Sequence, residues 1–407
     1  MKIHGQMHGP TSGQNPNVYF QAAAIRTSDV ANERFVALPR REMVRVADSS
    51  AFPYIAEGSA DWRALHRAGR LTSGRLGGAL NLWAPSNAQV LGFKSTPRQG
   101  ITRMLDAYTQ IAGLAVNLTE GGDVADAQRH NLQAHLTAVD QVDGVEAVQA
   151  RSLVEEIKLR KARHLQSLGS LVDVRLAWGS AQEASTIQTI CERFHEDSRY
   201  YMEVGMIEPD RETLKRYGFD TGTLPPLGST PDCICVGSVS SREQAIEVFA
   251  DMCTPTDNVN RNNRFQVVEV KNSTPFRLSK RKKTFELRDF GPRQRVEAVW
   301  VVQLQFHLLC SGAASALLVS RSATKGTNVF EMQRDEEYIR LLLTCVKAFY
   351  ERYCVPGKRP PKNALSDLKE HRQLLLKTRQ LALRTALLHH IPHEPLEGAD
   401  PRSFLSV

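Results

Sequence analysis

Two short β-branched stretches of the sequence carry charged side chains at spacings that matter on a strand. Asp232 follows a proline in STPDCICV (229–236), and Glu269 and Lys271 stand two apart in FQVVEVKNSTPF (265–276). Because side chains two apart on a strand share a face, Glu269 and Lys271 are expected to project together while Val270 turns into the core. Asp232, leading into a neighbouring strand, would add a second carboxylate beside them.

This set of residue types suits the hydrolysis of a phosphodiester with a divalent metal. Carboxylates are hard oxygen ligands, and a bound metal lowers the pKa of its water and neutralises charge that develops on phosphorus. Asp232 and Glu269 are the candidate ligands, and the main-chain carbonyl of Val270 is a further one. Lys271 would orient the attacking water or help to deprotonate it. Taken alone, a Glu-x-Lys pair more often marks an exposed strand, and Pro-Asp is an ordinary turn dipeptide.

The elements that would hold these residues are predicted from the period of the apolar positions. Helices are expected at 174–194, 242–252, 296–312 and 335–353, and strands at 231–236, 265–270, 314–320 and 327–333. The order of these elements predicts an α/β (α+β) fold, in which helices flank a mixed sheet.

Five segments in one order resemble the PD-(D/E)XK nucleases of the lambda exonuclease type, also called YqaJ-like viral recombinase nucleases. The segments are DWRALHRAGRLTSGRL (61–76), WGSAQEA (178–184), GSTPDCICV (228–236), VVEVKNSTPF (267–276) and WVVQLQFHLLCSG (300–312). The resemblance implies a restriction-endonuclease-like core, which is a mixed β-sheet flanked by helices, with a helical insertion. Five segments in a shared order are far more specific than any one of them.

The resemblance also assigns roles to single residues. Asp232 and Glu269 match the metal-binding carboxylates of the family, and Lys271 matches its catalytic lysine. Glu183 matches a helix glutamate that supports a metal or its water. Gln303 matches the first glutamine of a Gln-x-Gln pair that reaches the active site.

A phosphate-binding role is implied for the opening segment of the resemblance. Arg67 aligns with an arginine that in the family engages the terminal phosphate of the DNA strand, a task suited to the fork of a guanidinium. Thr72 and Ser73 would add hydroxyl donors.

A strongly basic segment follows the Glu-x-Lys strand. Residues 276–295 contain eight basic side chains against two acidic ones. We interpret this segment as a loop that grips DNA phosphates, a contact that is independent of sequence and sensitive to salt. A solvated charged loop and a nuclear import signal remain alternatives. The basic cluster consists of Lys280, Arg281, Lys282 and Lys283.

The resemblance, together with charge and composition, divides the chain into five expected regions. They are a loose N-terminal arm (1–50), N-terminal helices of the nuclease domain (51–94), an acidic helical insertion (95–168), the nuclease core (169–354), and a Pro-rich linker, basic helix and tail (355–407). The net charge of +8 over 407 residues favours an acidic partner. The acidic character of the insertion lies in residues 111–150, which contain six acidic side chains against one basic one. This stretch makes the insertion a poorer DNA surface than a surface for a protein partner or an oligomer.

Cysteine usage and hydropathy bear on the compartment. Seven scattered cysteines, an odd number, are expected to be reduced thiols rather than a disulfide framework. No apolar run approaches the length of a membrane span. These features predict an intracellular protein of the nucleus or cytoplasm that contacts no membrane.

The function implied by the resemblance is a Mg²⁺-dependent deoxyribonuclease, with Mn²⁺ able to substitute. It would resect linear double-stranded DNA from the 5′ end in recombination, repair or replication, as a possible homo-oligomer and with a recombinase or single-strand-binding protein as partner. An endonuclease on the same fold and a catalytically idle DNA-binding scaffold remain alternatives. The sequence has no phosphate-binding loop of the ATPase type and no C-terminal cysteine cluster, so neither ATP nor an iron-sulfur cluster is expected.

Overall fold

The computed structural model of the chain describes residues 34–36, 49–55, 60–67, 69–116, 171–194, 199–253, 264–278, 285–287 and 289–393. For some residues within these ranges, among them Arg67 and both strands of the β7–β8 pair, only the backbone is described. Most of the acidic stretch, together with the cluster from Lys280 to Lys283, lies outside these ranges.

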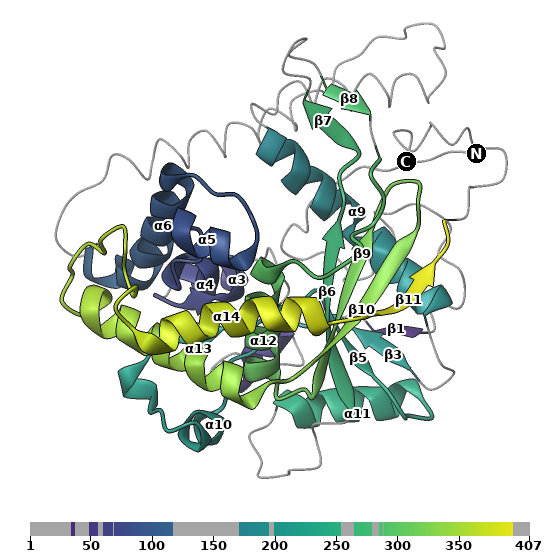
Figure 1. Cartoon of the computed structure of the whole chain (residues 1–407). Coiled ribbons are helices and arrows are strands. Elements are labelled where there is room, and N and C mark those ends of the chain that lie inside the picture. Colours follow the sequence, from purple (N-terminus) through teal and green to yellow (C-terminus); the bar gives the residue numbers. More distant parts are fainter. Residues whose placement is uncertain are drawn as a thin grey trace, which may run out of the picture.

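A seven-stranded mixed sheet forms the centre of the fold (Figure 1). β1 pairs with β3, and β6 pairs with β9, in parallel, whereas the other neighbouring strands are antiparallel. In sheet order the strands are β1 (Phe35–Val36), β3 (Tyr200–Met202), β5 (Cys233–Val236), β6 (Phe265–Asn272), β9 (Ser315–Arg321), β10 (Thr327–Gln333) and β11 (Leu387–Ile391). The predicted mixed sheet flanked by helices is confirmed.

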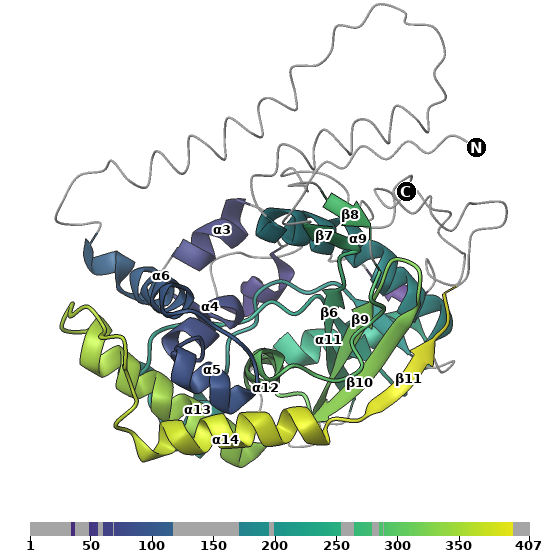
Figure 2. The same cartoon turned by 45° about the horizontal axis from the view of Figure 1, so that its top comes forward.

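Helices gather mainly on one side of this sheet, with α12 between the sheet and the rest (Figures 1 and 2). α9 packs against the opposite face of the sheet. The α-helices are α3 (Ala60–Arg67), α4 (Ser73–Ala79), α5 (Pro85–Leu91), α6 (Pro97–Val116), α9 (Leu171–Arg193), α10 (Arg211–Arg216), α11 (Arg242–Cys253), α12 (Ala298–Ser311), α13 (Glu336–Phe349) and α14 (Lys369–Arg384). Short helical turns lie at η2 (Ser49–Tyr54), η3 (Thr221–Thr223) and η5 (Tyr350–Cys354).

The alternation of side chains along β6 separates two hydrophobic cores. Val267 packs in the larger core with α12, whereas Val268 and Val270 pack in the smaller core with Ile187 and Ile190 of α9. This is the period-2 pattern of a strand that is covered on both faces. Val270 therefore turns into the core, as the sequence predicted.

α13 shows how the sequence determines one of the covering helices. The Asp335 side chain caps the helix by accepting a hydrogen bond from the Tyr338 amide at 2.8 Å. Apolar residues then recur at helical spacing and form one buried stripe. The stripe consists of Ile339, Leu342, Leu343, Val346 and Phe349.

The C-terminal region, for which the sequence predicted a linker, a basic helix and a tail, is integrated into the fold as far as residue 391. α14 packs on α5, α12 and α13, and the chain then enters the sheet as β11, beside β10. His390 Nδ1 lies 2.6 Å from Asn328 Oδ1 across this pair. The sequence of residues 387–391 alone does not indicate this strand, because its partner β10 lies far away in the chain.

Two smaller strand pairs complete the description. β2 (Leu71–Thr72) pairs in parallel with β4 (Leu227–Gly228). β7 (Phe276–Leu278) pairs with β8 (Phe285–Leu287), so the basic segment that the sequence suggested as a loop begins as an antiparallel hairpin above the end of β6 (Figure 1). Residues 279–284, between β7 and β8 in the sequence, lie outside the described residues.

Cysteine pairing and membrane-crossing potential can be assessed within the described ranges. Six cysteines there are free and buried: Cys191, Cys233, Cys235, Cys310, Cys345 and Cys354. Among the helices that the structure describes, none combines the length and apolar character that crossing a bilayer would require.

The close packing of α4 on α6 gives a first test of the fold. A Cβ added at Gly78 would lie 2.2 Å from the Arg103 carbonyl oxygen, whereas one added at Gly74 would meet nothing within 4 Å. We expect Gly78→Ala to lower the free energy of unfolding by about 1 to 3 kcal/mol, because the helices must separate. On the same helix, Gly74→Ala should be neutral or stabilise by up to about 1 kcal/mol. Urea unfolding of both variants measures the difference, and equal effects would contradict this packing.

Candidate active site

β6 extends beyond the point at which its neighbour β5 begins. The antiparallel register of β5 and β6 runs from Val236 opposite Phe265 to Cys233 opposite Val268. β6 then continues along β9 as far as Asn272. The edge of β6 facing β5 is therefore open to another partner just beyond Val268, in the middle of an otherwise buried sheet.

The side chain of Asp232 occupies that position. Its Oδ2 accepts a hydrogen bond from the Val270 amide at 2.5 Å. The N–H and C=O of a strand residue point to the same side, so the Val270 carbonyl is also directed towards Asp232. Val270, which the sequence predicted as a main-chain ligand, thus lies beside Asp232, the first candidate carboxylate.

Glu269 and Lys271 project from the opposite side of the strand to Val270, as their spacing predicted. Glu269 is only 3% exposed. Its Oε1 accepts hydrogen bonds from the ammonium of Lys271 and, at 2.6 Å, from Nε2 of Gln303 on α12. Four of the sequence-predicted residues, Asp232, Glu269, Lys271 and Gln303, are therefore brought together around one end of β6.

His307 is a member of this cluster that the sequence analysis missed. Its Nδ1 lies 3.0 Å from Ser229 Oγ, and its Nε2 lies 3.0 Å from Glu269 Oε2. The second approach lacks the geometry of a hydrogen bond, although both atoms are buried. The available signal was the spacing of Gln303 and His307, four apart on a helix and hence on one face.

Burial and neighbouring charges set the ionisation of the two carboxylates. Burial, and after it the nearby Glu269 and Glu183, raises the pKa of Asp232 well above its usual range. Burial also raises the pKa of Glu269, but Lys271 and then His307 outweigh it and lower that pKa to about 2. The cluster therefore keeps Glu269 ionised and makes a second full negative charge at Asp232 unfavourable without a further cation.

Lys271 is held as an ammonium by the same contacts. Burial lowers the pKa of Lys271, but the nearby Glu269 and Asp232 outweigh it and raise that pKa. A lysine in this state can orient a water molecule and neutralise negative charge, whereas it cannot accept a proton.

α9 places Glu183 near the cluster from the other side of the sheet. Thr186 Oγ1 donates to Asn272 Oδ1 at 2.7 Å, and Asn272 Nδ2 donates to the Gly179 carbonyl at 3.0 Å, which fastens α9 to the end of β6. Glu183 is half-buried and near enough to raise the pKa of Asp232 and of Lys271. Its direct contribution to a ligand remains a prediction.

The expected phosphate-binding residues are placed only in part. Thr72 is 6% exposed and its partner across the β2–β4 pair is Gly228, so the opening segment lies beside the stretch that leads to Asp232. Ser73 is half-buried at the start of α4. Arg67 ends α3, and its side chain lies outside the described residues, as do Lys280, Arg281, Lys282 and Lys283. Their roles remain predictions.

A buried arginine near Arg67 has a structural role instead. The guanidinium of Arg70 forms an ion pair with Glu208, and its Nη1 donates to the Leu227 carbonyl at 3.1 Å. It also lies over the ring of Phe52, with 5.4 Å to the ring centroid. These contacts hold β4, the strand immediately before Ser229, in position.

The oxygen ligands that Asp232 and Glu269 offer fit Mg²⁺ better than a metal ion whose ligands all come from the protein. Among the described residues no group of three or more His, Cys, Asp or Glu side chains is placed to hold a metal ion. Mg²⁺ commonly uses only one or two carboxylates and completes its shell with water and substrate phosphate, whereas structural zinc needs four protein ligands. Asp232 and Glu269 supply two carboxylates, and Glu269 Oε2 is a buried oxygen without a hydrogen bond of standard geometry.

The chain shows a distant structural likeness to a known protein. No family model matches the sequence, and no curated protein matches it. Among solved structures, the chain is similar to an alkaline exonuclease from Laribacter hongkongensis, with 13% sequence identity and a TM-score of 0.29, over 73% of this chain and 93% of that chain. A likeness of this size carries no weight for activity, so any function must be argued from the motifs and the site geometry.

The contact between His307 and Ser229 provides a test of the cluster. In a double-mutant cycle of His307→Ala and Ser229→Ala, we expect a coupling of about 1 kcal/mol in the free energy of unfolding, because a buried hydrogen bond is shared by the two side chains. His307→Ala alone should cost about 2 to 4 kcal/mol, because it removes a buried polar group and leaves a cavity. The exposed His389 replaces His307 in the control cycle and should show no coupling with Ser229. Additive effects in the first cycle would contradict the contact.

Proposed function

We propose that this chain is a metal-dependent nuclease that hydrolyses phosphodiester bonds in DNA. The observation that carries the proposal is the Asp232 carboxylate bonded to the Val270 amide, beside the buried contact of Glu269 with Lys271. Two carboxylates and an ammonium are thereby assembled at the place where the pairing of β6 with β5 ends. The motif resemblance supports the same assignment.

A purely structural role explains this arrangement poorly. Bringing charged groups out of water costs several kcal/mol per ion, roughly, and apolar residues of similar volume often give equal or greater stability. Glu269 is 3% exposed, and the side chain of Lys271 is 25% exposed. Buried, mutually perturbed charges of this kind are typical of functional sites.

Each residue has a defined task in the proposed reaction. Asp232, Glu269 and the Val270 carbonyl would hold the Mg²⁺ ion, which when bound supplies Lewis-acid stabilisation of the phosphate and a more acidic water. Lys271 orients the attacking water and balances charge on the phosphate. Gln303 restrains the Glu269 carboxylate by donating a hydrogen bond to its Oε1 at 2.6 Å.

The substrate is proposed to be linear double-stranded DNA, attacked from its 5′ end. This polarity is implied by the motif resemblance. The basic segment supports a nucleic-acid substrate, because it leaves the end of β6 through β7, close to Lys271. An endonuclease is the alternative on the same residues, and Mn²⁺ should substitute for Mg²⁺. A recombinase or a single-strand-binding protein is the proposed partner.

One observation favours a second candidate, a DNA-binding scaffold without catalysis. Glu269 Oε1 already accepts two hydrogen bonds, and His307 lies 3.0 Å from Oε2. If this network keeps its present form when DNA binds, Glu269 has little capacity left for a metal. The same surfaces would then bind DNA without cutting it.

A cleavage assay on linear duplex DNA, labelled separately at each end, distinguishes these candidates. In Mg²⁺ or Mn²⁺ we expect progressive loss of one label, and a chelator should abolish it. Asp232→Ala and Lys271→Ala should each lower the rate by about a hundredfold or more, because each removes a group that acts on the reacting phosphate. The matched controls are Asp367→Ala and Lys347→Ala, which remove like charges from exposed ion pairs elsewhere.

The pattern of products decides between the outcomes. Loss of a terminal label establishes an exonuclease and its polarity, whereas internal cuts in a closed circle establish an endonuclease. Salt-sensitive DNA binding without cleavage of ends, nicks or single strands would reject the nuclease in favour of the scaffold. Equal rates for the site variants and the control variants would remove Asp232 and Lys271 from the mechanism.

A further inference from the structure

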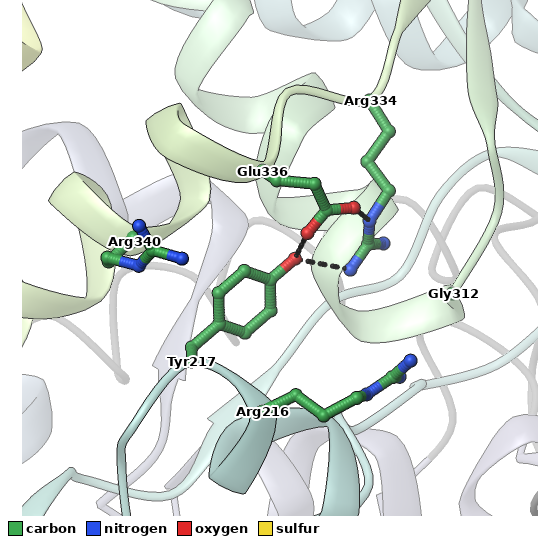
Figure 3. A pocket seen from close by; sticks show the side chains of 6 residues that line it. All are labelled: Arg216, Tyr217, Gly312, Arg334, Glu336 and Arg340. Carbon is green, nitrogen blue, oxygen red and sulfur yellow. Dashed lines mark hydrogen bonds and ion pairs between the residues drawn. The ribbon is translucent and has the colours of Figure 1, made fainter.

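A pocket rich in arginine lies near the C-terminal end of α12, separate from the cluster around Glu269. It has a volume of about 260 Å³ and is lined by Arg216, Tyr217, Gly312, Arg334, Glu336 and Arg340 (Figure 3). The residues come from the end of α10, the end of α12, the link between β10 and α13, and the first turns of α13. Three guanidinium groups and one carboxylate thus line this pocket.

One wall of the pocket is fixed by a closed hydrogen-bonded group. Arg334 Nε donates to Glu336 Oε1 at 2.8 Å, and its Nη2 donates to Tyr217 Oη at 2.8 Å. Tyr217 in turn donates to Glu336 Oε2, and Arg334 Nη1 donates to the Leu308 carbonyl. The charge of Glu336 is therefore balanced by Arg334, and the phenol of Tyr217 adds a hydrogen bond to the same carboxylate.

The protonation of this wall is stable near neutral pH. Burial raises the pKa of Tyr217 to about 12, so the phenol keeps its proton and remains a donor. Burial raises the pKa of Glu336, but Tyr217 and Arg334 outweigh it, lower that pKa and keep the carboxylate ionised. The wall therefore contains an ionised carboxylate that is paired with one guanidinium group.

Two arginines of the pocket have a positive charge that can bind an anion. Within the described part of the chain, neither Arg216 nor Arg340 makes an ion pair at 4.0 Å or less. Arg216 Nη2 donates to Thr213 Oγ1 at 2.9 Å, which restrains its guanidinium and leaves its other donors available. Figure 3 shows Arg216 and Arg340 on different sides of the Tyr217 ring. Both side chains are exposed at the mouth of the pocket.

We propose that this pocket binds a phosphate group carried by a nucleotide, with Arg216 and Arg340 as the anion-binding residues. Guanidinium groups bind phosphate oxygens through charge-assisted, often paired, hydrogen bonds. Two guanidinium groups at one pocket suit a phosphate ligand better than a carboxylate ligand. The choice of a nucleotide over other phosphate esters rests on the proposed function.

The size of the pocket limits what it can enclose. Sites that bury a whole drug-sized ligand measure roughly 300 to 1,000 Å³. At about 260 Å³ this pocket suits the phosphate and the sugar next to it, with the remainder outside. A phosphate within a nucleic-acid strand and the phosphate of a free nucleotide share this chemistry.

The test compares binding by wild type, by an Arg216→Gln/Arg340→Gln variant and by a control variant. The control, Arg372→Gln/Arg384→Gln, removes two exposed positive charges from α14. The probes are a short single-stranded oligonucleotide, a duplex, a mononucleotide and the corresponding nucleoside without phosphate. Binding is measured with a chelator present, by anisotropy for the strands and calorimetry for the small probes, so no cleavage is required.

We expect the pocket variant to bind phosphate-bearing probes about tenfold more weakly than the control variant does, because two charge-assisted hydrogen-bonding groups are removed. None of the three proteins should bind the nucleoside measurably. For the strands, the dependence of log affinity on log salt should weaken by about one unit for each phosphate that the variant no longer binds. Weaker binding of strands identifies a nucleic-acid phosphate, and weaker binding of the mononucleotide alone identifies a free nucleotide.

Equal affinities of the pocket variant and the control variant for every probe would overturn the proposal. Because the measurements need neither metal nor catalysis, they are independent of the cleavage assay. A chain that fails to cut DNA but shows the tenfold difference keeps this site and loses the nuclease assignment. A chain that cuts DNA without the difference keeps the nuclease and loses this site.

Discussion

The hydrogen bond from the Val270 amide to the Asp232 carboxylate takes the place of a strand pairing that β5 does not provide. An unpaired amide at this depth would cost about 1 to 3 kcal/mol, so a polar partner is required wherever β5 begins late. Using a carboxylate as that partner brings a negative charge into the sheet beside Glu269. Lys271 and Gln303 lie where they donate hydrogen bonds to Glu269. The helices around the site are likewise placed so that these two carboxylates have polar partners.

One polar face of α12 contacts Glu269, and a second polar residue on another face holds neighbouring elements of the fold. Gln303 and His307 reach Glu269 and connect it to Ser229, whereas Gln305 holds the end of β10 and the start of α13 through the Gln333 carbonyl at 2.8 Å and the Asp335 amide at 3.0 Å. Arg334 fastens the last turn of the same helix through the Leu308 carbonyl. A helix anchored by polar contacts at several points is held against rotation, which a purely apolar interface does not guarantee. The orientation of the carboxylate in the candidate site therefore depends on contacts well outside it.

The same anchoring explains why charge is left over at the far end of α12. Arg334 is committed to the main chain and to Glu336, and Tyr217 completes that group. Glu336 is therefore paired first with Arg334 and Tyr217, and Arg216 acts on it only as a further charge that lowers its pKa. Positive charge remains in the pocket at the C-terminal end of α12, beyond the residues that contact Glu269. Two polar clusters of opposite character thus flank one helix, one rich in carboxylates and the other in guanidinium groups.

The sequence by itself determined the order of the central elements, from β5 and α11 through β10 and α13, because apolar period and strand length are local properties. It also identified Asp232, Glu269, Lys271 and Gln303 as one set, through strand spacing and the order of the motifs. Only the tertiary structure placed His307 and Ser229 in that set, showed Arg70 as a buried structural residue, and brought residues 387–391 into the sheet as β11. Those contacts join residues far apart in the chain, and a sequence pattern carries no record of which distant polar group will satisfy a buried one.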